Sequence, residues 1–150
     1  MILDRRGIAA LEFAVVAPVL LTGLASLTDF GLALADRTQL ATAVDAGAAY
    51  AFAQGQAVAD TNQSVSATDV QAKVLAATAL GATVSVTGPA THCIANATLT
   101  AGTAGTACPN GQPPGTYMII TARFQYHPIL PVYSLMATTT LTETASVRLY

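Results

Sequence analysis

Charge is scarce in this chain of 150 residues. Six lysines and arginines oppose eight aspartates and glutamates, and charged residues make up 9% of the whole, against about a quarter in ordinary globular proteins. The net charge of −2 offers no basic surface, so a nucleic acid is not expected as a partner. A surface so poor in charge repels other proteins only weakly, which suits a chain that packs against copies or partners.

Motifs of catalytic chemistry are missing as well. The sequence has a single lysine, Lys73, it has no glycine-rich phosphate loop, and no evident nucleophile accompanies His92 or His127. A hydrolase needs an oriented nucleophile or a metal ion, and the spacing of residues supports neither. We therefore expect no enzyme, no catalytic residues, no metal site and no cofactor.

Cysteine is limited to Cys93 and Cys108, whose spacing is not that of a redox-active CxxC motif. The stretch between them is rich in glycine, alanine and threonine, which is typical of a loop. In an oxidising compartment we expect a disulfide, which would contribute roughly 3 kcal/mol in the chain-entropy description of a loop this long. Two free, buried thiols are the alternative.

The chain does contain one long apolar run. It covers residues 8–27, IAALEFAVVAPVLLTGLASL, and one acid, Glu12, interrupts it. As an α-helix this run would span about 30 Å, the thickness of the bilayer hydrocarbon. We expect a transmembrane helix over residues 8–28. A secretory signal peptide is the alternative, but its apolar core would be only about 7–15 residues long.

Basic residues predict the orientation of this helix. Arg5 and Arg6 precede the run, and the next basic residue is Arg37. The positive-inside rule then leaves the N-terminus in the cytoplasm and sends residues 29–150 across the membrane. An acid at the centre of a membrane helix costs about 2.5–3.5 kcal/mol, so such acids tend to be paired and functional. Glu12 lies early in the run, and a tolerated boundary acid is the alternative.

The segment RRGIAALEFAVVAPVLL resembles the N-terminus of TadE-like proteins, the minor pseudopilins of Tad (Flp-type) type IV pilus systems. Residues 29–53 resemble the same family, although Ala49 stands where an arginine is common. The resemblance implies that a prepilin peptidase cuts after Gly7. Residues 1–7 would then be a leader, Ile8 the first residue of the mature chain and Glu12 the fifth.

The same resemblance implies how the subunit assembles. Glu12 of one subunit would neutralise the free N-terminus of its neighbour as the helices pack. The residues expected at this contact are Ile8, Glu12, Phe13 and Pro18. The implied function is that of a minor pilin with a role in pilus biogenesis, adhesion and biofilm formation. The alternative is a single-pass, membrane-anchored periplasmic domain that binds an envelope component without polymerising.

Partners and location follow from the resemblance too. The expected partners are other pilin and pseudopilin subunits, the prepilin peptidase, the inner-membrane assembly platform and the lipid bilayer. The expected location is the bacterial inner membrane, with a periplasmic C-terminal domain over residues 29–150 that enters the extracellular pilus after assembly.

The remaining pattern predicts an α+β fold with the pilin outline. The transmembrane helix should continue as an amphipathic helix to about residue 54, closed by Gly55. Helical spacing places on its packed face Phe30, Leu34, Ala41, Val44, Ala48 and Phe52.

A short second helix is expected over residues 67–80, capped by Ser66, with Gly81 after it. Alternating residues then predict a small antiparallel sheet, and Pro128 and Pro131 bracket a turn-rich link before its last strand. Glu143 falls on the apolar face of that strand, which an edge position or a partner such as Arg123 would explain. The predicted strands cover residues 82–87, 116–126 and 138–149.

The cleavage site gives a first test. Because the peptidase is expected to require glycine at this position, a Gly7→Val chain should keep Met1, whereas the unaltered chain should begin at Ile8. Mass spectrometry of the intact chains from the native host measures both. A Gly7→Val chain that still begins at Ile8 would place the cleavage site elsewhere.

Overall fold

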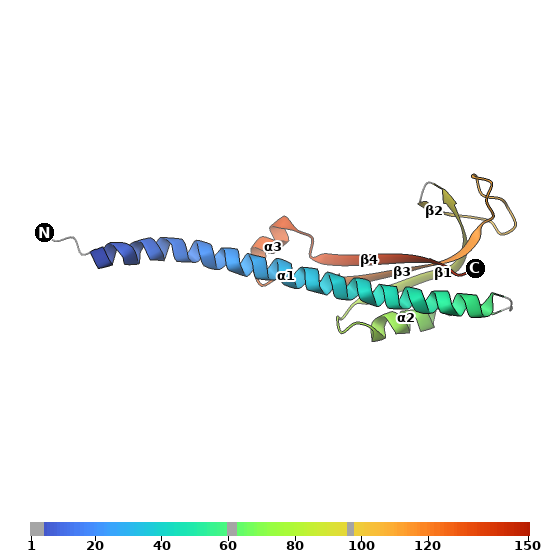
Figure 1. Ribbon diagram of the computed structural model, residues 1–150, viewed down its shortest axis with the longest axis horizontal. Helices are drawn as coiled ribbons and strands as arrows, with labels where there is room; N and C mark the ends of the chain where they lie inside the picture. Colours follow the sequence, from blue (N-terminus) through green and yellow to red (C-terminus); the bar gives the residue numbers. More distant parts are fainter. Residues whose placement is uncertain (1–4, 60–62, 96–97) are drawn as a thin grey trace. The chain divides into compact units, whose positions relative to one another are not determined.

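The computed structural model describes residues 5–59, 63–95 and 98–150, the side chains of residues 5–8 and 132 excepted (Figure 1). Residues 1–4 of the expected leader lie outside this description. The fold is α+β, as predicted from the sequence. Its elements in chain order are α1 (Arg5–Val58), α2 (Ala67–Ala76), β1 (Thr83–Ala95), β2 (Thr98–Ala101), β3 (Gly115–Gln125), α3 (Pro131–Met136) and β4 (Thr140–Arg148).

The chain divides into two compact units. The first comprises Met1–Ala35 with Tyr126–Thr139, and so holds the front of α1 together with α3. The second comprises Asp36–Gln125 with Thr140–Tyr150, and so holds the rest of α1, α2 and the sheet. The leader, membrane span and outer domain expected from the sequence follow a different division of the chain and stay predictions.

The sheet of the second unit has the strand order β2-β1-β3-β4, and every neighbouring pair is antiparallel. The alternation predicted for its last two strands is confirmed: β3 buries Met118, Ile120 and Ala122, and β4 buries Leu141. These side chains form the sheet's contribution to the core. β4 lies at an edge of the sheet, which is one of the two explanations offered for Glu143.

The first strand is longer than predicted. β1 continues past residue 87 because a bulge accommodates Gly88 and Pro89, where the pairing with β3 shifts register. Gly88 has a φ of +112°, and a Cβ there would lie 2.6 Å from the Tyr117 carbonyl oxygen. Gly88 and Pro89 therefore introduce a bulge into β1 without ending the strand. β2 was expected as loop and instead pairs with β1.

The predicted packed face of α1 is wrong in three of its six members. Val44 is buried, but Phe30, Leu34 and Phe52 are exposed, and the buried face of the helix is shifted along its surface. Small side chains dominate that face because the rest of the unit lies close against it. In the second unit it comprises Leu40, Ala43, Val44, Gly47, Ala51 and Gly55.

Two glycines of α1 permit the close packing. A Cβ at Gly47 would collide with the Val74 side chain of α2 and lie 3.7 Å from Ile120 of β3. A Cβ at Gly55 would lie 2.8 Å from Leu149. The prediction that Gly55 closes the helix is wrong, since α1 runs on to Val58.

The short helices differ from expectation at their ends. The Ser66 cap of α2 is confirmed, because its side chain accepts a hydrogen bond from the Asp69 amide at 3.3 Å. α2 stops at Ala76, and the amide of Ala77 bonds to the Lys73 and Val74 carbonyls. The turn-rich link contains a helix, α3, which begins at Pro131. Proline suits a first helical turn, where its missing N–H removes no helix bond.

The packing at Gly47 gives a second test. Alanine there must displace a fully buried valine, so Gly47→Ala should lower the free energy of unfolding by about 1–3 kcal/mol. Gly31 is the matched control, because no atom lies within 4 Å of a Cβ built on it. Gly31→Ala should instead stabilise the helix by about 0.5–1 kcal/mol. Urea unfolding in detergent, followed by circular dichroism, measures both, and equal effects would contradict the packing described.

Candidate assembly surface

The front of α1 is an uncovered apolar surface. Within the described residues, α1 is the helix long and apolar enough to cross a membrane, and none of its most apolar window is buried by the rest of the chain. The Phe13 side chain, for instance, is 71% exposed. A surface of this extent needs lipid or protein to cover it. It comprises Leu11, Phe13, Val15, Val16, Val19, Leu20, Leu21, Leu24 and Leu27.

The hydroxyl side chains along this part of α1 bond to their own helix. Thr22 donates to the Pro18 carbonyl at 2.7 Å, Ser26 to the Thr22 carbonyl at 2.8 Å and Thr28 to the Leu24 carbonyl at 3.0 Å. Each bond reaches four residues back, so each hydroxyl is satisfied without water. A segment built in this way is suited to the bilayer interior, where no solvent can satisfy a polar group.

The residues expected at the processing and assembly site all lie on this one helix. Arg5 and Arg6 begin α1, and Gly7 and Ile8 follow in its first turns. Glu12 lies one turn after Ile8, and its side chain is exposed, like that of Phe13. Pro18 lies inside the helix, where it lacks the N–H that would bond four residues back. The structure thus places these residues on one helix, and their roles stay predictions.

A buried acid, missed in the sequence, organises the other end of the first unit. Asp29 is fully buried, and its carboxylate accepts hydrogen bonds from the amides of Ile129 at 2.7 Å and Leu130 at 2.8 Å. The Tyr126 hydroxyl lies 3.1 Å from the same carboxylate and 3.0 Å from the Asp29 carbonyl oxygen. Leu130 is the residue that caps α3. The acid therefore ties the start of α3 to α1.

Aromatic rings surround this acid. The Tyr133 ring centroid lies 4.9 Å from that of Phe30 and 5.2 Å from that of Tyr126. Burial alone would raise the pKa of Asp29, but the bonds from Ile129, Leu130 and Tyr126 outweigh it and hold the pKa below its ordinary value. The carboxylate is therefore charged and fully bonded at neutral pH. A lone acid just after an apolar run was its only signal in the sequence.

Glu143 forms an ion pair in the second unit, but its partner is not Arg123, the residue suggested from the sequence. Glu143 lies opposite Ala122 in the β3–β4 pairing, so Arg123, the next residue, points to the other face. The partner of Glu143 is Arg37 of α1, whose Nε lies 2.6 Å from Glu143 Oε1. The proposed Arg123 partner is therefore wrong. The sequence could not indicate Arg37, because 106 residues separate the pair.

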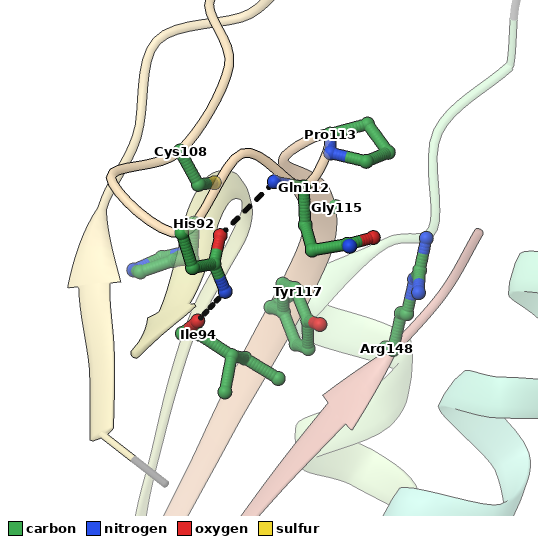
Figure 2. A pocket seen from close by; sticks show the side chains of 9 residues that line it. His92, Ile94, Cys108, Gln112, Pro113, Gly115, Tyr117 and Arg148 are labelled. Atoms are coloured by element: carbon green, nitrogen blue, oxygen red, sulfur yellow. Dashed lines mark hydrogen bonds between the residues drawn. The ribbon is translucent and has the colours of Figure 1, made fainter. Parts of the chain in front are cut away.

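Cys93 of β1 and Cys108 of the β2–β3 connection form a disulfide, with their Cα atoms 5.6 Å apart. A shallow pocket of about 230 Å³ lies beside it (Figure 2). Asn110 shapes its wall by donating to the Ile94 carbonyl at 2.8 Å and accepting from the Gln112 amide at 3.1 Å. Ligand pockets usually measure about 300–1,000 Å³. The lining residues are His92, Ile94, Cys108, Asn110, Gln112, Pro113, Gly115, Tyr117 and Arg148.

In the part of the chain that the structure describes, no three His, Cys, Asp or Glu side chains lie close enough together to bind a metal ion. The His92 ring instead meets the Tyr117 ring edge-on, with the two ring centroids 6.2 Å apart. Its Nδ1 lies 3.1 Å from the Ala90 carbonyl oxygen. These contacts assign it a structural place in the sheet.

The Asp29 contact gives a third test. Asparagine has one acceptor oxygen where aspartate has two, so Asp29→Asn should lose at least one of the bonds to Ile129 and Leu130. Hydrogen–deuterium exchange at those two amides should become faster by about tenfold or more. Asp45→Asn is the matched control, because Asp45 is an exposed acid of the same helix.

Acid should have a similar effect to this substitution. Folding lowers the pKa of Asp29, so its charged carboxylate stabilises the first unit fully at a pH above 3.8, the ordinary pKa of the group. This stabilisation is lost as the pH falls through the lower pKa of the folded state. Exchange at Ile129, corrected for the intrinsic pH dependence, should therefore accelerate below that pH. Protection that is unchanged in both the variant and the acid would contradict the role given to Asp29.

Comparison with known proteins bears on the front of α1. No curated protein and no solved structure gives a significant match to the chain. One family model matches, and its description is TadE-like protein. The match covers residues 7–49, so it starts at Gly7 and ends within α1, before the sheet begins. The resemblance drawn from the sequence is confirmed: the N-terminal segment of this chain matches the TadE-like family over residues 7–49.

Proposed function

We propose that the chain is a minor pilin or pseudopilin that assembles through its N-terminal helix into a Tad-type pilus. The TadE-like match and the apolar helix fit a pilin-like protein associated with a Tad system. The observation that supports the finer proposal is that Gly7, Ile8 and Glu12 lie in this order at the start of one long helix whose apolar span the rest of the described chain leaves uncovered.

The physical argument rests on Glu12. A carboxylate within hydrocarbon is unfavourable unless a positive group lies beside it. Cleavage after Gly7 would create such a group, the α-ammonium of Ile8. Within one subunit, this ammonium is at the start of the helix that carries Glu12. The helix of a neighbouring subunit can place its own ammonium beside Glu12. The pair would then fix the axial register between subunits, and Phe13 and Pro18 would pack in the same contact.

The proposal includes a location and partners. Arg5 and Arg6 would hold the N-terminus in the cytoplasm, and the rest of the chain beyond the span would be periplasmic until assembly. The prepilin peptidase, the inner-membrane platform and other pilin subunits would act on or contact the front of α1. A contribution to adhesion and biofilm formation would follow from membership of the pilus.

The pocket beside the disulfide favours a second candidate function. A membrane-anchored periplasmic domain could bind an envelope component there, with Tyr117 and Arg148 offering a ring and a positive charge (Figure 2). The pocket is small for a ligand site, so this candidate has the weaker support. It requires no cleavage after Gly7 and no contact at Glu12.

The Glu12 carboxylate gives a fourth test, made in the native host. Glu12→Ala should leave membrane insertion intact and reduce incorporation into sheared pili by about tenfold or more, because a charge-assisted bond contributes roughly 1.5–3 kcal/mol. Leu11→Ala is the matched control, since Leu11 is an exposed, uncharged neighbour on the same helix. Pili that contain Glu12→Ala at the normal level would exclude the proposed pairing, whereas absence of the unaltered chain from sheared pili would favour the anchored binding domain.

A further inference from the structure

The segment before and within α3 exposes apolar side chains that the rest of the described chain leaves uncovered. Leu135 is 85% exposed, Met136 72% and Ile129 66%. These three side chains, here called the α3 patch, fall within eight residues of one another. Leu135 is more exposed than Phe13, which lies in the apolar span itself. In water such a patch is costly, so its environment needs an explanation.

The α3 patch is tied to the point where the apolar span ends. Its segment is bonded to Asp29 through the amides of Ile129 and Leu130, and Tyr133 of α3 packs against Phe30. Leu27, the last large apolar residue of the span, is two residues before Asp29 and about 3 Å from it along the helix axis. Figure 1 shows α3 beside α1, which continues from there toward its N-terminal end.

The composition of this segment suits a membrane interface. Residues 126–139 contain no lysine, arginine, aspartate or glutamate. The Tyr126 and Tyr133 rings near the buried acid are themselves buried, so the large exposed apolar side chains described in the segment are those of the α3 patch. The Asp29 carboxylate keeps its charge, but it is fully buried and both of its oxygens accept amide hydrogen bonds, so this charge is not exposed at the interface.

We propose that the α3 patch is a second membrane contact, with Ile129, Leu135 and Met136 inserted at the boundary between headgroups and acyl chains of the leaflet that α1 leaves. This inference rests on the membrane anchoring of α1 proposed above. Phospholipid is the occupant favoured by continuity, because the exposed leucines of α1 at positions 24 and 27 already lie against lipid if the span crosses the bilayer. A shallow apolar segment of this kind lies in the interface without crossing it.

A second contact would restrict the motion of the anchored chain. A single helix can rotate about its axis and tilt in the bilayer, and neighbouring contacts or interfacial anchors set both angles. The α3 patch lies to one side of α1, so it would fix which face of the helix points along the membrane surface. Before assembly, this would give every anchored subunit the same depth and the same presentation of Glu12.

The test measures the depth of single sites in the full chain. Cysteine introduced by Leu135→Cys carries an environment-sensitive nitrobenzoxadiazole label, while Cys93 and Cys108 are protected by their disulfide. The chain is reconstituted in vesicles of phosphatidylethanolamine and phosphatidylglycerol, with or without a lipid that carries a doxyl quencher high in its acyl chain. Leu20→Cys reports the span itself, and Leu75→Cys, an exposed leucine of α2, is the matched aqueous control.

The proposal expects the Leu135 label to show blue-shifted emission and to lose fluorescence to the quencher, while the Leu75 label shows neither. A Leu135 label that behaves like the Leu75 label overturns the second contact. A blue-shifted Leu135 label that the lipid quencher does not reach also overturns it, because a second copy of the chain would then cover the patch. Failure of the Leu20 label to enter the bilayer would separately overturn the membrane anchoring on which the inference rests.

Discussion

The first unit depends on one buried carboxylate. Asp29 follows directly after the apolar run, and it accepts two amide bonds from the segment that leads into α3. Without these bonds the amides of Ile129 and Leu130 and the charge itself would be left unsatisfied in an apolar surrounding of tyrosine and phenylalanine rings. The contact joins two parts of the chain a hundred residues apart. It therefore determines that a C-terminal segment lies beside the end of the apolar helix.

The second unit depends chiefly on the close packing of α1. Gly47 and Gly55 remove the side chains that would separate α1 from Val74, Ile120 and Leu149. Small residues therefore form the buried face of the helix, and larger ones such as Phe52 remain on its outer surface. The exposed apolar side chains of α1 and the low total charge of the chain are consistent with membrane anchoring.

The family match does not follow the division into two units, since it crosses from the first unit into the second. The TadE-like match ends at residue 49, so it accounts for the apolar helix and leaves the sheet, the disulfide and α3 to be explained from the structure. The hydroxyls of Thr22, Ser26 and Thr28 bond within α1, so Glu12 is the conspicuous polar group that the described span leaves exposed. This contrast is the reason that the proposed function places the contact between subunits at this carboxylate.

Much of the architecture could be read from local patterns. The apolar run, the Ser66 cap and the alternation of β3 and β4 depend on neighbours in sequence, so the sequence by itself determined the α+β class, the long helix and the last two strands. The tertiary structure alone decided which face of α1 is buried, that Arg37 pairs with Glu143, and that Asp29 holds α3. Each of these outcomes depends on how closely distant segments approach, which side-chain periodicity within one element does not encode.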